Sequence, residues 1–287
     1  MSDSDYWSLY EDGKKLEPLK YSNGKTQEDV VKEVVELIRA GKKVIFIHGV
    51  CGTGKSAIAL NIARNIGRTS IIVPLKNLQK QYADDYTGKK HLIDKNGAKM
   101  EIGIITGRAN HDCLIFPNTS CDDPFLPDTI LITEKNKEKI FGYYSQNPLI
   151  KNKINPKIHS LRRISIAPSN PYWSHICPAN FELNQLSDAE KKCYKGVSGR
   201  DYIFYHRKKG CGYYDQFQAY INSDIIIFNS AKYNIEMAIG RKPFTEVDII
   251  DEADLFLDNF SEEASLNLTH FISVSYTHLT LPTILRV

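Results

Sequence analysis

The feature that constrains this chain most is a glycine-containing loop within "VIFIHGVCGTGKSAIAL", which runs from Val44 to Leu60. The loop satisfies the spacing G-x-x-x-x-G-K-[ST] with Gly49, Gly54, Lys55 and Ser56. The apolar residues before it favour a buried strand, and the alanine-rich residues after it favour a helix. A strand, such a loop and a helix in this order predict an α/β fold whose loop wraps phosphate groups. An ordinary glycine turn between a strand and a helix is the alternative.

The loop residues have distinct expected roles at a nucleoside triphosphate. Glycines let the backbone approach the phosphates and point its N–H groups at them, beside the positive end of the following helix. Lys55 is expected to neutralise the β- and γ-phosphates and to assist catalysis, and Ser56 to bind Mg²⁺. Cys51 is interpreted as a bystander and not as a metal ligand. The residues expected to surround the phosphates are Gly49, Val50, Cys51, Gly52, Thr53, Gly54, Lys55 and Ser56.

The segment "VDIIDEADLF" (residues 247–256) indicates a second part of this site. Its apolar strand delivers Asp251 and Glu252 at the carboxyl end, where ligands of parallel sheets bind. Asp251 is expected to hold Mg²⁺ through water, and Glu252 to orient and deprotonate the attacking water. This pair favours ATP hydrolysis over phosphoryl transfer to another substrate. A solvated acidic turn is the alternative.

Helix and strand patterns alternate along most of the chain. Helices are expected at 26–41, 54–66, 75–86, 213–221 and 231–240, and strands at 42–48, 69–74, 100–106, 223–229 and 246–251. This alternation predicts a parallel sheet with helices on both faces. Roughly 100 residues with little periodicity interrupt it, so we expect an irregular inserted module. The expected organisation is a first part of the α/β domain at 1–109, the insert at 110–212, the remainder of the domain at 213–272, and a tail at 273–287.

Charge is distributed unevenly along a chain whose net charge is only +3. Between Lys139 and Cys211 there are 13 Lys/Arg and four Asp/Glu, a net charge of +9, so the rest of the chain carries −6. Aromatic residues are interleaved with these charges, which is typical of a path for single-stranded nucleic acid. The triplet Arg207, Lys208 and Lys209 is expected to contact DNA. A solvated charged face with aromatics in a small core is the alternative.

The cysteines concentrate in the same insert, which holds five of the six. Four thiolates would bind a [4Fe–4S] cluster or zinc, and either would stabilise a module with few apolar stretches. The spacings include no C-x-x-C, so unrelated buried cysteines are the alternative. No apolar run approaches the ~20 residues of a membrane helix, and the N-terminus has no signal-peptide core. We therefore expect an intracellular protein, in the cytoplasm or the nucleus.

The order of motifs resembles that of superfamily 2 helicases, whose second motif is similar to "DEAD" at 251–254. A more particular resemblance, to the XPD/DinG family of iron–sulfur DNA helicases, rests on "GRANHDC" (107–113), "GCGYYDQ" (210–216) and "SDIIIFNSAKYN" (223–234). It covers roughly residues 25–260 and implies a RecA-like lobe interrupted by a cluster domain. The family usually has His where Asp254 stands, so hydrolysis is expected to be coupled somewhat differently here.

The resemblance also assigns roles to further residues. It implies that Gln27 reads adenine, that "VPLKNLQKQ" (73–81) contacts the nucleic-acid backbone, and that Cys113 and Cys211 are cluster ligands. Two more ligands are chosen because they approach Cys211 at similar intervals. The expected set is Cys113, Cys177, Cys193 and Cys211, with Cys121 in reserve and zinc as the alternative metal.

The expected function is that of an ATP-dependent DNA helicase, which couples ATP hydrolysis to movement on, or unwinding of, single-stranded or forked DNA. The expected cofactors are ATP, Mg²⁺ and the cluster. The alternatives are a DEAD-box-type RNA helicase and a zinc-stabilised nucleic-acid-binding module without motor activity. Such a motor needs a second RecA-like lobe, and residues 273–287 resemble a foreign tail. We therefore expect an N-terminal fragment that hydrolyses ATP poorly by itself.

Overall fold

The computed structural model describes residues 6–49, 52–151, 156–181, 183 and 186–258. Met1 to Glu252 form one compact unit, and a second unit begins at Ala253. The described part of the second unit is helix α9 (Ala253–Asp258). The expected tail at 273–287 lies outside the described residues. All other elements belong to the first unit.

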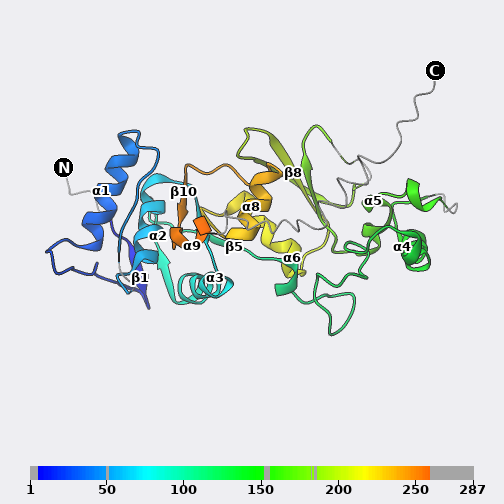
Figure 1. The fold of residues 1–287 in the computed structure, drawn as a ribbon, viewed down its shortest axis with the longest axis horizontal. Coiled ribbons are helices and arrows are strands. Elements are labelled where there is room, and N and C mark those ends of the chain that lie inside the picture. Colours follow the sequence, from blue (N-terminus) through cyan, green and yellow to red (C-terminus); the bar gives the residue numbers. More distant parts are fainter. Residues whose placement is uncertain (1–5, 50–51, 152–155, 182, 184–185, 259–287) are drawn as a thin grey trace, which may run out of the picture. The chain divides into compact units, whose positions relative to one another are not determined.

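A four-stranded parallel sheet, in the order β10-β3-β9-β5, forms the centre of the first unit (Figure 1). Its strands are β3 (Thr69–Val73), β5 (Ile102–Ile105), β9 (Ile225–Asn229) and β10 (Val247–Ile250). Every neighbouring pair in this sheet is parallel. Strands β3 and β9 are buried along their whole length, as expected for apolar strands covered on both faces. The predicted α/β fold with a parallel sheet is confirmed.

Helices cover both faces of this sheet. They are α2 (Lys55–Ile66), α3 (Lys76–Ala83), α6 (Gly212–Asp215), α7 (Ala219–Asn222) and α8 (Ser230–Ala238), and α1 (Gln27–Arg39) packs against α2. Ile225 and Ile227 of β9 share one apolar cluster with residues of α1, α2 and α3. Ile226 and Phe228 share another with residues of α6 and α7. The alternation of side chains along β9 therefore joins the two layers of helices.

Helix α1 begins where the local sequence predicts. The Thr26 hydroxyl accepts a hydrogen bond from the N–H of Asp29, and the Asp29 carboxylate accepts one from the N–H of Thr26. This capping box satisfies N–H groups that a helix start leaves without partners. Val31 and Val35 are fully buried against the first unit's core. An amphipathic pattern and a cap together position α1 beside the phosphate loop.

The prediction of a strand at 42–48 is wrong. Residues 44–48 adopt no strand pairing in the described structure, and the edge strand β10 has its ladder with β3. Ile45 packs on the core, whereas Val44 and Phe46 are 72% and 82% exposed. A short apolar run shows that a segment is hydrophobic, but a strand also needs a hydrogen-bonding neighbour, which the run does not specify.

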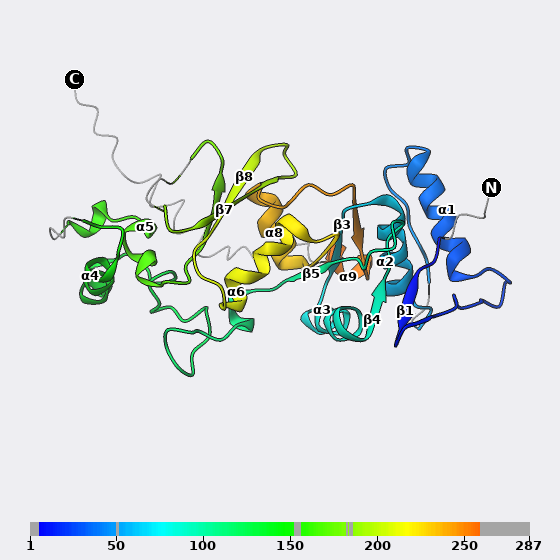
Figure 2. The same ribbon diagram turned by 180° about the vertical axis from the view of Figure 1, so that it is seen from behind.

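The insert contains more regular structure than its sequence pattern indicates. Its elements are α4 (Lys137–Gln146), α5 (Arg163–Ile166), β6 (His175–Pro178), β7 (Glu190–Lys195) and β8 (Asp201–His206). The three strands form an antiparallel sheet in the order β6-β8-β7, with β7 and β8 side by side in Figure 2. The aromatic side chains of β8 are buried. These side chains pack in one apolar cluster with Ile226 and Phe228 of β9, so the insert shares part of its core with the parallel sheet.

A small antiparallel sheet near the N-terminus was not expected from the sequence. It joins β1 (Leu9–Glu11), β2 (Lys14–Lys15) and β4 (Lys90–Leu92). Trp7, just before β1, is 1% exposed and belongs to the same apolar cluster as α1 and α2. This packing anchors the start of the described chain to the lobe that carries the phosphate loop.

Candidate functional site

The phosphate loop joins residue 49 to helix α2. Val50 and Cys51, two of its expected residues, lie outside the described residues. Gly52 and Gly54 have φ angles of 83° and 72°, in the left-handed region that glycine adopts without a Cβ penalty. Gly54 is the N-cap of α2, so the first N–H groups of that helix face the loop. The loop thus has the backbone geometry that favours an anion at a helix start.

Two side chains from outside the loop hold its backbone. The Tyr21 hydroxyl donates a hydrogen bond of 3.0 Å to the Thr53 carbonyl. The Gln27 amide donates to the same carbonyl at 3.1 Å and accepts from the N–H of Leu19 at 2.8 Å. Gln27 is 2% exposed, and a Cβ on Gly54 would lie 2.2 Å from its Nε2 atom. Gln27, expected to read adenine, is therefore positioned here to support the loop.

The carboxyl end of β10 carries the acidic pair. The N–H of Asp251 donates to the Ile72 carbonyl at 2.9 Å, which continues the ladder with β3 past the end of the strand. Glu252 has a φ of 50°, a left-handed conformation that costs a non-glycine residue about 1–2 kcal/mol. Such strain often occurs at functional positions. It turns the chain so that adjacent carboxylates have different partners.

Lys55 and Glu252 form an ion pair although 197 positions separate them in the chain. Their Nζ and Oε1 atoms are 2.8 Å apart, and about a quarter of each side chain is exposed. The two residues that the sequence assigns to catalysis therefore lie in direct contact. A phosphate group that bound Lys55 would compete with Glu252 for the ammonium.

Tyr82 of α3 contacts the same site and was missed by the sequence analysis. Its hydroxyl donates to Oδ2 of Asp251 at 3.0 Å. Burial and the Asp251 carboxylate raise the pKa of Tyr82 well above its ordinary value. The only sequence signal was its spacing of four residues from Leu78, which places both on one face of the predicted helix.

The residues expected to hold Mg²⁺ fit that ion. Ser56 and Asp251 supply a hydroxyl and a carboxylate oxygen, the hard ligands that Mg²⁺ prefers. Their neighbours Lys55 and Glu252 form an ion pair of 2.8 Å, so the two segments that carry Ser56 and Asp251 meet at the mouth of the loop. The structure therefore brings together Lys55, Ser56, Asp251 and Glu252 from two distant segments of the sequence.

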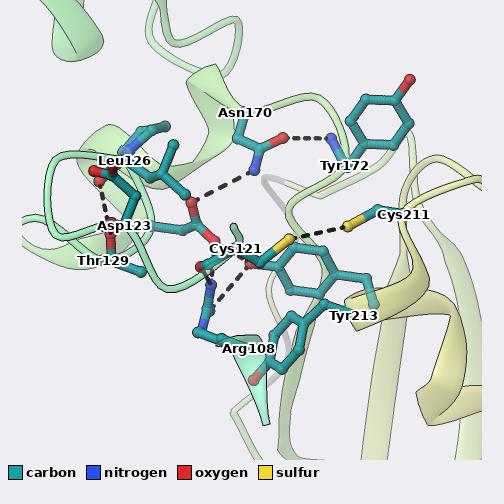
Figure 3. Close-up of polar contacts among 12 residues, drawn as sticks. Arg108, Cys121, Asp123, Leu126, Thr129, Asn170, Tyr172, Cys211 and Tyr213 are labelled. Carbon is teal, nitrogen blue, oxygen red and sulfur yellow. Dashed lines mark hydrogen bonds and ion pairs between the residues drawn. The ribbon is translucent and has the colours of Figure 1, made fainter. Parts of the chain in front are cut away.

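The expected iron–sulfur or zinc site does not fit the described residues. Cys121 and Cys211 approach each other, with their sulfur atoms 4.0 Å apart (Figure 3). Cys177 and Cys193 instead lie on β6 and β7, each opposite Ile203 of β8, and Cys193 is exposed. Among the described residues, no group of three or more His, Cys, Asp and Glu side chains could hold a metal ion. Similar sequence intervals did not predict which cysteines meet in space.

Cys121 and Cys211 belong instead to a polar cluster centred on Arg108, which Figure 3 shows. Arg108 is paired with the buried Asp128 at 2.6 Å, and its guanidinium lies 4.3 Å from the centre of the Tyr213 ring. It also donates to the Cys121 carbonyl at 3.2 Å. Hydrogen bonding from Cys121 lowers the pKa of Cys211 to about 7. The "GRANHDC" and "GCGYYDQ" motifs thus meet in one structural cluster.

The expected DNA-contacting triplet divides into two kinds of residue. Arg207 pairs with Asp188 at 3.0 Å, donates to two backbone carbonyls, and has a side chain only 5% exposed. Lys208 and Lys209 are exposed, and the ammonium of Lys208 lies 4.8 Å from the centre of the Tyr172 ring. Arg207 is therefore engaged within the insert, whereas the two lysines are accessible to a ligand.

Most of the aromatic residues interleaved with the basic charges are core residues. Those that are buried are Trp173, Tyr194, Tyr202, Phe204 and Tyr205. Stacking on nucleic-acid bases requires an accessible ring face. The solvated charged face over an aromatic core, the alternative considered from the sequence, describes these five rings.

Comparison with known protein families finds a match for part of the chain. Residues 20–155 match the sequence model of the family described as "Type III restriction enzyme, res subunit". No curated protein and no solved structure matches the chain. None of the helices in the described part of the chain has the length and apolarity needed to cross a membrane. The matched segment contains the phosphate loop, α1, α2 and α3. With the parallel sheet, this similarity supports a helicase-type ATP-binding lobe.

Proposed function

We propose that this chain is the ATP-binding lobe of an ATP-dependent DNA helicase. One observation carries the proposal. The ion pair of Lys55 with Glu252 brings together two pairs of adjacent residues, Lys55 with Ser56 and Asp251 with Glu252, at the carboxyl edge of a parallel sheet. They lie beside a loop whose glycines Gly52 and Gly54 have left-handed backbone conformations. Ligands of such sheets bind at this edge. The family similarity over residues 20–155 supports the same type of lobe.

The chemistry follows from the charges of these side chains. The phosphates of ATP would occupy the loop, where they receive backbone N–H groups and the ammonium of Lys55. Magnesium, held by Ser56 and Asp251, would neutralise phosphate charge. When Lys55 pairs with a phosphate, its 2.8 Å ion pair with Glu252 breaks, and the Glu252 carboxylate becomes available to a water molecule. Glu252 would then orient the attacking water and accept its proton at Oε1.

The nucleic-acid partner is proposed from the insert. Lys208 and Lys209 present exposed positive charge from a segment with a net charge of +9. Backbone phosphates bind such charges without regard to sequence. The motifs shared with XPD/DinG helicases favour DNA. The cysteine geometry does not support a cluster, so no step of this proposal uses one.

Slow ATP hydrolysis, measured with single-stranded DNA or RNA of the same sequence, tests this function. We expect DNA to stimulate hydrolysis more than RNA. Glu252→Gln should still bind ATP but hydrolyse it at least about 100-fold more slowly, because it removes the base that takes the proton from water. Hydrolysis at the wild-type rate by Glu252→Gln would contradict the assignment, and stimulation by RNA alone would favour an RNA helicase.

A further inference from the structure

Tyr82 lies outside every motif of the nucleotide site and yet contacts one of its residues. Its hydroxyl donates to the carboxylate of Asp251, which follows β10. Asp251 is one of the two residues expected to hold Mg²⁺. The tyrosine itself comes from α3, a different segment of the chain.

We propose that Tyr82 is a positioning residue for magnesium, whose hydroxyl fixes the orientation of the Asp251 carboxylate toward the metal. This inference rests on the proposed ATP site and deepens it. Tyr82 acts through Asp251 and does not itself contact the phosphates.

The Asp251 carboxylate is held at both oxygen atoms. Oδ2 accepts from the Tyr82 hydroxyl at 3.0 Å, and Oδ1 accepts from the N–H of Glu252 at 3.1 Å. The backbone of Asp251 is fixed as well, by its hydrogen bond to Ile72. Without the tyrosine, the carboxylate could rotate about its side-chain bonds. Outer hydrogen bonds of this kind orient metal ligands in proteins.

A carboxylate held by Tyr82 suits magnesium. Mg²⁺ prefers oxygen ligands and usually keeps several of its waters. Asp251 would therefore hold the ion through a water while its Oδ2 atom accepts the hydrogen bond from Tyr82, and this is the role expected of Asp251 from the sequence.

The hydroxyl is explained by this partner and not by packing. Tyr82 is 2% exposed within the apolar cluster of α1, α2 and the parallel sheet. A phenylalanine would fill this space equally well, and burying a hydroxyl is costly unless it is hydrogen-bonded. Its ring lies 5.7 Å from that of Tyr86, so neighbouring groups hold it in place. A rigid ring therefore carries the hydroxyl to a fixed point beside the Asp251 carboxylate.

The test compares Tyr82→Phe with Tyr86→Phe, a matched control on the next helical turn. Both variants remove one hydroxyl, but only Tyr82 has a hydrogen bond to Asp251 in the described structure. Affinity for a fluorescent ADP analogue is measured in chelator and across a magnesium titration, with thermal unfolding in parallel. Magnesium should enhance the affinity for the ADP analogue, and we expect Tyr82→Phe to raise the Mg²⁺ concentration that gives half of this enhancement by about 10–100-fold. Its affinity in chelator, and both properties of Tyr86→Phe, should match wild type.

Two results would overturn the inference alone. One is a wild-type magnesium midpoint in Tyr82→Phe. The other is an equal loss of affinity with and without Mg²⁺, which would show that the hydroxyl supports the loop and not the metal. If wild-type protein bound no nucleotide at any Mg²⁺ concentration, the proposed ATP site would fail first, and the inference with it.

Discussion

The nucleotide edge of the parallel sheet and the inserted segment 110–212 differ in how well their sequence motifs predict which residues lie together. At the nucleotide edge, residues expected to act together do meet: Lys55 contacts Glu252 at 2.8 Å. In the insert, the chosen cysteines form no metal-binding group among the described residues, and Cys177 and Cys193 lie on the two outer strands of the antiparallel sheet. A motif with a fixed backbone geometry predicts positions, whereas composition alone predicts only residue types.

The same contrast applies to charged side chains. Lys55 is partly exposed in a site open to a ligand, whereas Arg207 is 5% exposed and bound to carbonyls of its own insert. Both were assigned to phosphate contacts from the sequence. What separates them is the partners that the fold supplies, because an arginine can satisfy several buried carbonyls at once.

The largest effect that would sharpen this contrast is expected from Gly54→Ala. Alanine in this left-handed conformation costs roughly 1–2 kcal/mol, and its Cβ would lie 2.2 Å from Nε2 of Gln27. Displacing Gln27 also breaks its hydrogen bond to Thr53, worth about 1 kcal/mol. Together these predict roughly 100-fold weaker nucleotide binding, since each 1.4 kcal/mol is about tenfold. Equilibrium titration with labelled ATP measures it.

Gly97→Ala is the matched control for that variant. Gly97 also has a positive φ, of 85°, but a Cβ there meets nothing within 4 Å. It should cost similar backbone strain and leave nucleotide affinity unchanged. If both alanine variants bound ATP as the wild type does, support of the loop by Gln27 would not matter for binding.

A smaller effect is expected from Arg207→Ala, on stability. The variant leaves the carbonyls of Pro168 and Asn170 without the donor they have now, so the free energy of unfolding should fall by about 1–3 kcal/mol. Chemical denaturation followed by tryptophan fluorescence measures the change. If Arg207→Ala left stability unchanged and weakened DNA binding, Arg207 would be assigned again to a contact with DNA.

The smallest effect on folding is expected from the double variant Lys208→Ala/Lys209→Ala. Both lysines are exposed, so stability should stay within about 0.5 kcal/mol of wild type. Binding to single-stranded DNA should weaken, with the log–log salt slope reduced by about 0.7 for each lost phosphate contact. Fluorescence anisotropy at several salt concentrations provides the slope. An unaltered slope would assign these lysines to a merely solvated face.

The sequence predicted helices and strands correctly where neighbouring residues in the chain specify them. The helix predicted at 26–41 matches α1, which begins at the capping box of Thr26 and Asp29, and the apolar run before Asn229 predicted β9. The phosphate-loop spacing predicted the start of α2. In each case the residues that specify the element lie next to one another in the chain. Short-range interactions are therefore sufficient to identify them.

The sequence did not predict strand pairing or side-chain contacts that depend on residues far apart in the chain. Val44 to His48 is as apolar as β9 but has no strand pairing in the described structure, because pairing depends on a neighbour. Tyr82 has no motif around it, and its role follows only from its position beside Asp251. The approach of Cys121 to Cys211 across 90 positions also depends on tertiary packing. Such contacts are set by the whole fold and not by spacing.

Titration of Mg·ATP into wild-type protein and Lys55→Ala tests most directly whether this edge of the sheet is an ATP site. We predict saturable binding at one site in the wild type. Lys55→Ala should bind at least about 100-fold more weakly, because it removes a charged partner of the phosphates, with an unchanged thermal midpoint. Lys76→Ala, which changes the first residue of α3 as Lys55→Ala changes that of α2, should bind as wild type. Equal affinity of wild type and folded Lys55→Ala would contradict the account.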